Sequence, residues 1–239
     1  MYSAREKPIF ENRYDAGRQL AMLLGEYKGK SVVVLAIPNG GVPVGMEVAS
    51  ALEADFDLVV SRKIPLPINT EAGFGAVADD GTVILNDDLV KRAGLNQQQI
   101  DFQVNQVRLE IRRRRLLYRQ ERPPALVGGK TVIITDDGLA SGFTMLATVA
   151  SVRSRKPREI IVAVPVSSVV ALEEVGKVAD KVFTVATGSL PRFAVADFYK
   201  NWHDISDEEV FRALDEWRQR RFKSNIKPNG MADRTLGRG

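Results

Sequence analysis

Short unbroken runs of aliphatic residues alternate along this chain with longer segments in which apolar residues recur every three or four positions. Unbroken aliphatic runs are typical of strands buried on both faces of a parallel sheet, and the longer spacing is typical of amphipathic helices. The pattern predicts strands at 31–37, 57–61, 131–135, 159–166 and 181–186, and helices at 13–27, 42–52, 86–93, 96–118, 145–152 and 168–175. Such alternation favours an α/β fold with a Rossmann-like, mostly parallel sheet and helices on both faces.

Two segments depart from this alternation. Residues 64–73 contain two prolines and are expected to form a loop, and the strand-like segments that follow are joined by Asp79-Asp80-Gly81, which is a hairpin signature. From Thr187 onwards an irregular, aromatic-rich segment leads to a last helix, which begins at a capping box formed by Ser206 and Glu209. The expected organisation is one domain at 1–222, with a flexible hairpin lid at 64–86 and a hood at 187–222, followed by a disordered tail at 223–239.

Composition narrows the class of protein. The chain has 239 residues, of which 44% are hydrophobic and 27% charged, as in soluble globular proteins. Cysteine is absent, which excludes disulfides and is consistent with a reducing cytoplasm, and a single histidine, His203, excludes a histidine-rich metal site. We find neither a membrane-spanning run nor a signal peptide. The net charge of +4 suits a polyphosphate substrate and also RNA.

The stretch from Thr131 to Met145 contains the densest candidate chemistry. A strand-like run ends in two adjacent carboxylates, Asp136 and Asp137, and a loop of small residues then leads into a helical segment. Unpaired amides at the start of a helix bind phosphate. The carboxylates would repel phosphate, so they suit ribose hydroxyls or a divalent metal. A sugar phosphate therefore fits this stretch better than a bare anion.

The run from Ile134 to Met145 resembles the phosphoribosyl-pyrophosphate motif of type I phosphoribosyltransferases. The order of motifs over residues 8–221 is similar to that of predicted phosphoribosyltransferases of bacteria and archaea. The resemblance implies transfer of a phosphoribosyl group to a nitrogenous base, with Mg²⁺ and release of pyrophosphate. It implies that Asp136 and Asp137 act in catalysis and hold the metal, and that Glu71, in the lid, lies near the reacting base. The implied substrate-binding residues are Asn39, Gly40, Gly41, Arg62, Lys63, Gly138, Leu139, Ala140, Ser141, Gly142, Phe143 and Thr144.

For two groups of these residues, the neighbouring sequence also favours ligand binding. The paired glycines Gly40 and Gly41 follow a predicted strand and allow a ligand to approach the backbone closely. The resembled family often has a cation before these glycines, whereas this chain has Asn39, which is uncharged. Arg62 and Lys63, at the end of the strand predicted at 57–61, could supply the missing charge. A simple turn and a solvated basic pair are the alternatives.

The acceptor base is not identified by the sequence. Enzymes of this class that use 6-oxopurines usually carry a third acid two residues after Gly138, and this chain has Ala140 there, which argues against hypoxanthine and guanine. We expect the aromatic residues of 193–202 to help form the base pocket, or else to pack the last helix onto the sheet. We also expect Gly73 and Gly75 to act as lid hinges, and a homodimer is compatible with the sequence.

Two other functions are compatible with parts of the sequence. A non-catalytic regulator of the same fold could sense phosphoribosyl pyrophosphate or nucleotides and bind RNA or DNA, although no helix-turn-helix sequence is found outside the core, so we do not expect nucleic acid to be a partner. The run Arg112–Arg115 covers a full helical turn, and its arginines cannot all face one partner. A dinucleotide-binding oxidoreductase is disfavoured because no G-x-G-x-x-G follows any predicted strand.

Overall fold

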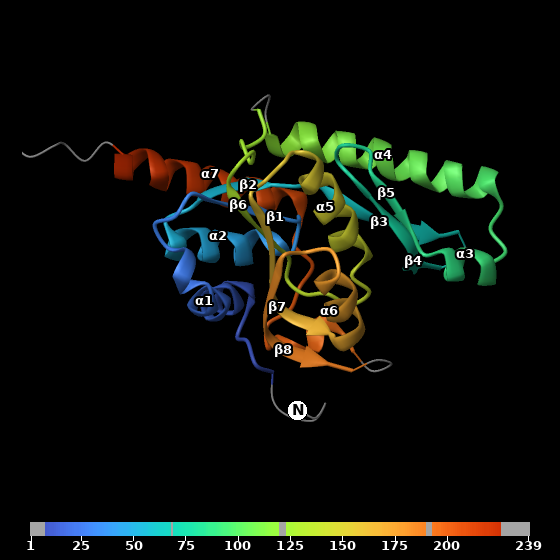
Figure 1. Ribbon diagram of the computed structural model, residues 1–239, viewed down its shortest axis with the longest axis horizontal. Coiled ribbons are helices and arrows are strands. Elements are labelled where there is room, and N and C mark those ends of the chain that lie inside the picture. The colour runs from blue at the N-terminus through green and yellow to red at the C-terminus, as the bar shows by residue number, and fades with distance from the viewer. Residues whose placement is uncertain (1–7, 68, 120–122, 190–192, 226–239) are drawn as a thin grey trace, which may run out of the picture.

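A five-stranded parallel sheet forms the centre of the computed structural model, which describes residues 8–67, 69–119, 123–189 and 193–225 (Figure 1). The strand order is β2-β1-β6-β7-β8. The strands are β1 (Val32–Ala36), β2 (Asp55–Leu58), β6 (Thr131–Thr135), β7 (Glu159–Ser168) and β8 (Lys181–Gly188). All four neighbouring pairs are parallel. The predicted α/β fold with a mostly parallel sheet is therefore confirmed.

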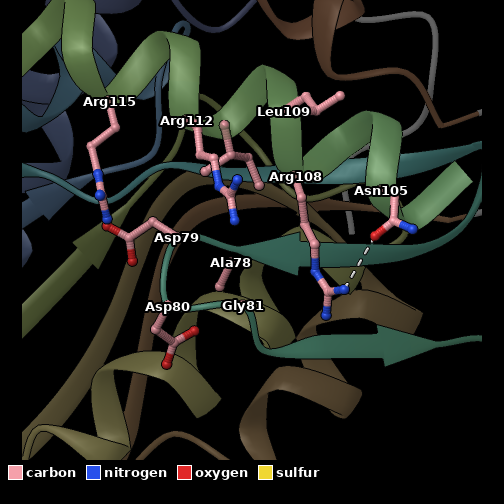
Figure 2. Close-up of a pocket in the computed structure, with 10 residues that line it drawn as sticks. Ala78, Asp79, Asp80, Gly81, Asn105, Arg108, Leu109, Arg112 and Arg115 are labelled. Atoms are coloured by element: carbon pink, nitrogen blue, oxygen red, sulfur yellow. Dashed lines mark hydrogen bonds between the residues drawn. The ribbon is translucent and has the colours of Figure 1, made fainter. Parts of the chain in front are cut away.

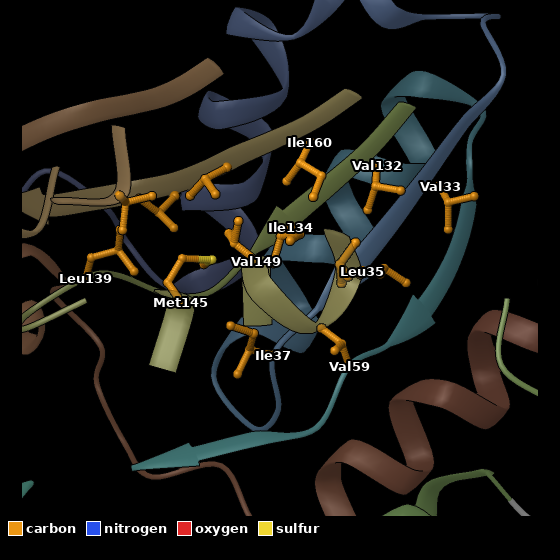
Figure 3. Packing of buried hydrophobic residues seen from close by; sticks show 14 of the residues in the cluster. Val33, Leu35, Ile37, Val59, Val132, Ile134, Leu139, Met145, Val149 and Ile160 are labelled. Atoms are coloured by element: carbon orange, nitrogen blue, oxygen red, sulfur yellow. The ribbon is translucent and has the colours of Figure 1, made fainter. Parts of the chain in front are cut away.

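Helices cover both faces of this sheet. Val32 and Val34 of β1 belong to the core under α1 (Arg13–Leu23) and α2 (Gly41–Leu52). Val33 and Leu35 face the opposite way, into the core under α5 (Phe143–Ser154) and α6 (Val169–Gly176), part of which Figure 3 shows. Successive side chains of a strand point to opposite faces, so burial on both sides explains why β1 and β6 are unbroken aliphatic runs.

A second sheet corrects two predictions. Its strands β3 (Ser61–Leu66), β4 (Asn69–Ala78) and β5 (Val83–Leu85) are antiparallel, in the order β3-β4-β5. The expected loop at 64–73 is wrong, because most of it pairs as β3 and β4. Pro65 is tolerated because it faces Gly73 at an irregularity of the register on an edge strand. The strand expected at 57–61 is present as β2, but its bounds were wrong, because β2 ends at Leu58 and Ser61 opens the second sheet.

The second sheet packs between two helices. Phe74 and Val77 lie in the same core cluster as Ile100 and Val104 of α4 (Gln97–Arg119). On the α5 side, Ala76 and Ala78 cluster with Ala147, and the Thr148 hydroxyl donates to the Ser61 hydroxyl at 2.9 Å. A side chain at Gly75 would lie 2.4 Å from the carbonyl oxygen of Ile84, so this glycine allows two strands to approach closely. Its role here is packing, and a hinge motion of the lid stays a prediction.

Three short elements and one long helix complete the described chain. They are η1 (Gly25–Tyr27), α3 (Asp87–Arg92), η2 (Val195–Phe198) and α7 (Asp207–Asn225). The capping box is confirmed, since the Glu209 amide donates to Ser206 Oγ and the Ser206 amide donates to a Glu209 carboxylate oxygen. Helix α7 continues to Asn225, so the predicted tail begins too early; residues 226–239 lie outside the described residues. None of the described helices combines the length and the apolar character needed to cross a membrane.

Candidate functional site

The loop from Gly138 to Gly142 lies between the end of β6 and the start of α5. It is fixed by the last residues of β7: the Leu139 amide donates to Val166 O, and the Ser168 amide donates to Leu139 O. The Ser168 hydroxyl also donates to Ala140 O at 2.7 Å. Within the described part of the chain, the amides from Ala140 to Gly142 donate no hydrogen bond. The loop therefore offers open amides at the positive end of a 12-residue helix, which is an arrangement that binds phosphate.

Gly142 has a role in the fold that the motif alone does not indicate. A small residue here would be expected to leave room for phosphate. In the structure Gly142 caps α5 with a φ of 79°, and a side chain would meet Ala171 of α6 at 3.2 Å. The glycine is required by the left-handed backbone and by helix packing. Ala140 and Ser141 are the exposed residues of the loop, and phosphate binding over them stays a prediction.

The two carboxylates at the end of β6 lie against the second glycine loop. A side chain at Gly40 would come within 1.9 Å of an Asp137 carboxylate oxygen, and one at Gly41 would lie 2.9 Å from the Asp136 Cα atom. The Ile37 amide donates to Thr135 O, which joins the two loops at their base. The structure therefore brings both predicted glycine loops and both acids together at the carboxyl ends of β1 and β6, where parallel sheets bind ligands.

The charges of the acid pair are set by burial and by one arginine. Burial raises the pKa of Asp136 well above its ordinary value, and the neighbouring Asp137 carboxylate raises it further. Burial also raises the pKa of Asp137, while Arg13 opposes that shift. Arg13 Nε donates to an Asp137 carboxylate oxygen at 2.8 Å, and only 6% of the Arg13 side chain is exposed.

Arg13 is itself held by the segment that follows β8. Its Nη1 atom donates to His203 O at 2.9 Å, and its guanidinium lies 3.8 Å from the centre of the Trp202 ring. Tyr199 is buried, and its hydroxyl donates to the Asp137 backbone oxygen at 2.6 Å. Val195 lies next to Gly138, where a side chain would be 2.6 Å from it. The predicted hood thus contacts the acid pair and the start of the phosphate loop.

The hood aromatics contribute chiefly to packing. The rings of Phe193 and Phe198 pack in a tilted arrangement with their centres 5.5 Å apart, and those of Tyr199 and Phe10 pack in the same way at 5.2 Å. Phe193 and Phe198 are half-buried, whereas Trp202 is 37% exposed. A base pocket formed by these rings stays a prediction. Glu71 belongs to β4, but its side chain lies outside the described residues, so its role is also untested.

Asn39 is tied into a polar network. Its amide nitrogen donates to Ile205 O and to Asp207, and its oxygen accepts from Arg114 and from Tyr118. Burial alone would raise the pKa of Asp207, but hydrogen bonds from Tyr118 and Asn39, together with the nearby arginines of α4, outweigh it and lower that pKa. The Asn39 side chain therefore joins the glycine loop to α4 and to the start of α7.

Arg62 and Lys63 lie where the sequence did not predict them. They belong to β3 of the antiparallel sheet and do not end a parallel strand. Arg62 Nη1 donates to Glu110 of α4 at 3.1 Å. Lys63 is exposed and forms an interaction of its own. The strand assignment behind this prediction was wrong, and substrate binding by either cation stays a prediction.

Sequence reasoning missed Arg13, Ser168 and Asp207 as parts of this site. Arg13 and Asp137 are 124 positions apart, and no local pattern connects them. Ser168 could be recognised only as a helix cap, because its hydroxyl accepts from the Ala171 amide. Ser168 could have been placed near the site only by assuming that β7 pairs with β6, because the carboxyl ends of two neighbouring parallel strands lie side by side.

Known proteins with similar sequences and structures extend these observations. The family model of the phosphoribosyl transferase domain matches residues 9–196. Two proteins from two strains of Mycobacterium tuberculosis, named "Putative phosphoribosyl transferase MT0597" and "Putative phosphoribosyl transferase Rv0571c", are each 39% identical over 207 residues. The match covers 87% of this chain and 46% of theirs, so the chain spans about half the length of these relatives. The crystal structure of TT1426 from Thermus thermophilus is 34% identical, with a TM-score of 0.71, covering 87% of this chain and 98% of that one.

Proposed function

Because this chain belongs to the phosphoribosyl transferase domain family, we propose that it transfers the 5-phosphoribosyl group of phosphoribosyl pyrophosphate to a nitrogenous base. One observation carries the proposal. A loop of open amides, two adjacent carboxylates and a second glycine loop meet at the carboxyl edge of the sheet. This set matches a ligand that bears a phosphate, free hydroxyls and a pyrophosphate, because each part has a group of suitable chemistry.

The residues have distinct parts in this reaction. The amides of Ala140 and Ser141 would bind the 5-phosphate at the start of α5. Asp136 and Asp137 would accept hydrogen bonds from the ribose hydroxyls and hold the sugar in place while the bond from C1 to the leaving oxygen breaks. A positive charge develops on the ribose at that stage, and fixed carboxylates stabilise it.

The acid pair also fits Mg²⁺. This ion is commonly bound by one or two carboxylates together with substrate phosphates and water, so a larger cluster is not needed. Among the residues that the structure describes, no group of three or more His, Cys, Asp or Glu side chains could hold a metal ion. When bound, Mg²⁺ would neutralise charge on the departing pyrophosphate. Asp136 and Asp137 are the residues that would hold it.

The base is proposed to bind between the phosphate loop and the hood. Ala140 supplies no carboxylate for the proton of a 6-oxopurine, so bases other than hypoxanthine and guanine are favoured. The half-buried Phe193 and Phe198 share a hydrophobic cluster with Val195, which lies next to Gly138, and Trp202 lies over Arg13, so these rings offer flat apolar surface in the hood. Glu71 of the lid is proposed to approach the reacting base.

The decisive experiment measures pyrophosphate release from phosphoribosyl pyrophosphate and Mg²⁺ with a panel of purine and pyrimidine bases. We expect release with at least one base, and none with the Asp136→Asn/Asp137→Asn double variant. Calorimetric binding of phosphoribosyl pyrophosphate is measured in parallel. Binding without release for any base would overturn transfer and favour a ligand-sensing regulator. Absence of binding would overturn the assignment of the phosphate loop itself.

A further inference from the structure

A second cavity lies between α4 and the turn that joins β4 to β5 (Figure 2). Its volume is about 540 Å³, which falls within the usual range of small-molecule sites, roughly 300–1,000 Å³. It includes none of the residues assigned above to the phosphate loop, the acid pair or the hood. The residues that line it are Ala78, Asp79, Asp80, Gly81, Asn105, Arg108, Leu109, Ile111, Arg112 and Arg115.

Helix α4 divides its arginines between two faces. Arg108, Arg112 and Arg115 are spaced by four and three residues, which places them on one face, and all three extend toward the β4–β5 turn (Figure 2). Arg113 and Arg114 point to the other side, where they contact Glu110 and Asp207. The arginines of this run therefore lie on two surfaces of α4, and only one of these surfaces contacts the Asn39 network.

The three arginines of the cavity are available to a ligand. All are exposed. Within the described residues, Arg112 and Arg115 form no ion pair, and Arg108 donates only a long hydrogen bond of 3.4 Å to Asn105. A guanidinium without a carboxylate partner presents a planar set of donors that matches phosphate oxygens. Three of them along about 10 Å of helix can contact a chain of two or three phosphates.

The opposite wall has different chemistry. Asp80 accepts from the Thr82 amide at 2.9 Å, and Asp79 also has a partner, so both carboxylates help to shape the turn. They would repel an extended polyanion, yet they can accept hydrogen bonds from sugar hydroxyls. Leu109, which is 58% exposed, and Ala78 also line the cavity and give it apolar surface for a flat ring. The cavity therefore offers arginines to phosphate, carboxylates to sugar hydroxyls and apolar side chains to a ring.

We propose that this cavity binds a nucleoside diphosphate or triphosphate, with its phosphates on Arg108, Arg112 and Arg115 and its ribose toward the β4–β5 turn. The site does not depend on the proposed transfer reaction. Its ligand would contact the helix whose other face holds Asn39, so a bound nucleotide is in a position to act on the glycine loop.

The test measures the anisotropy of a fluorescent ADP derivative titrated with the full chain. One guanidinium contact to phosphate is worth about tenfold in affinity, so Arg112→Gln/Arg115→Gln should weaken binding by roughly tenfold to a hundredfold. The matched control, Lys28→Gln/Lys177→Gln, removes the same charge from two exposed lysines elsewhere and should change binding less than about threefold. Thermal unfolding checks that each variant folds.

A second arm separates this cavity from the phosphate loop. Ser141→Glu places a carboxylate in the loop, which repels phosphate there, and binding of the ADP probe to the cavity should persist. If Ser141→Glu loses binding of the probe while the arginine variant keeps it, the probe binds at the phosphate loop and the proposal is overturned. Tighter, steeply salt-dependent binding of a single-stranded RNA that needs the same arginines would also overturn it, in favour of a nucleic-acid surface.

Discussion

Replacing Arg13 by methionine removes the charge that faces Asp137 while keeping much of the apolar stem. Arg13 is 6% exposed and the Asp137 side chain 16%, so the pair is largely shielded from water. Removing one partner of a buried ion pair costs about 3–5 kcal/mol, because the other charge is left uncompensated. Asp137 can escape part of this cost by taking up a proton, so we expect roughly 3 kcal/mol near pH 7.5.

The loss of folding stability in Arg13→Met should depend on pH. Arg13 opposes the effect of burial on the pKa of Asp137, so its removal raises that pKa further above the unfolded value of about 3.9. A group with a raised pKa in the folded state stabilises the fold below the unfolded pKa, and this contribution is lost as the pH rises. The Arg13→Met variant should therefore lose less stability near pH 5, roughly 1–2 kcal/mol from the lost hydrogen bond to His203 O and the contact with Trp202.

Urea unfolding near pH 5 and near pH 7.5 measures both effects. Arg18→Met is the matched control, because Arg18 lies on the same helix and pairs with Asp15 but is 58% exposed, and it should cost less than about 1 kcal/mol. In the double variant Arg13→Met/Asp137→Asn most of the loss near pH 7.5 should be recovered. A loss equal to that of Arg18→Met, or one that is the same at both pH values, would refute the reasoning.

Three further predictions concern neighbouring groups. Asp136→Asn removes a carboxylate whose pKa is raised by burial and by Asp137. In the absence of metal, the variant should therefore be more stable than the parent by at least about 1 kcal/mol near pH 7.5, with no gain near pH 4. Urea unfolding in the presence of a chelator measures this difference, and a loss of stability at pH 7.5 would contradict it. Gly40→Ala should cost roughly 1–3 kcal/mol because it displaces the Asp137 carboxylate, whereas Gly25→Ala, with open space around it, should be nearly neutral in the same thermal assay. Tyr118→Phe removes a hydroxyl that lies 3.0 Å from Asn39 Oδ1 and 2.6 Å from Asp207 Oδ1 and can donate its one proton to either of them. The change should cost about 1–2 kcal/mol in chemical unfolding, and no change in stability would show the network to be dispensable.

The central sheet could be predicted because its residues are constrained on both faces. β1 and β6 are buried throughout, so almost every position must be aliphatic, and the sequence shows it directly. The second sheet was missed in part because Pro65 and Gly73 are signals for loops as well as for irregular edge strands. Local composition cannot distinguish a loop from an irregular edge strand, because the distinction depends on whether another strand pairs with the segment that contains the proline.

The loops and acids of the candidate site were predictable, but the partners that fix them were not. A strand that ends in two acids and a small-residue loop is a local pattern, and the structure places the two glycine loops beside these acids. Arg13 reaches Asp137 across 124 positions, and Asp207 reaches Asn39 across 168. Such contacts depend on how α1 and α7 pack against the sheet edge, which no short stretch of sequence encodes.

The network around Asn39 changes how pyrophosphate binding should be understood. The sequence suggested that the Asn39 side chain donates to the ligand in place of a cation. In the structure its amide nitrogen and its oxygen already have two partners each, drawn from the hood, α4 and α7. Breaking any of these half-buried contacts has a cost that a neutral amide would not regain from a ligand. We therefore propose that Asn39 fixes the loop and that pyrophosphate meets the backbone at Gly40, because the Gly41 amide already donates to Ile37 O. A metal on the acid pair would then balance the charge of the pyrophosphate.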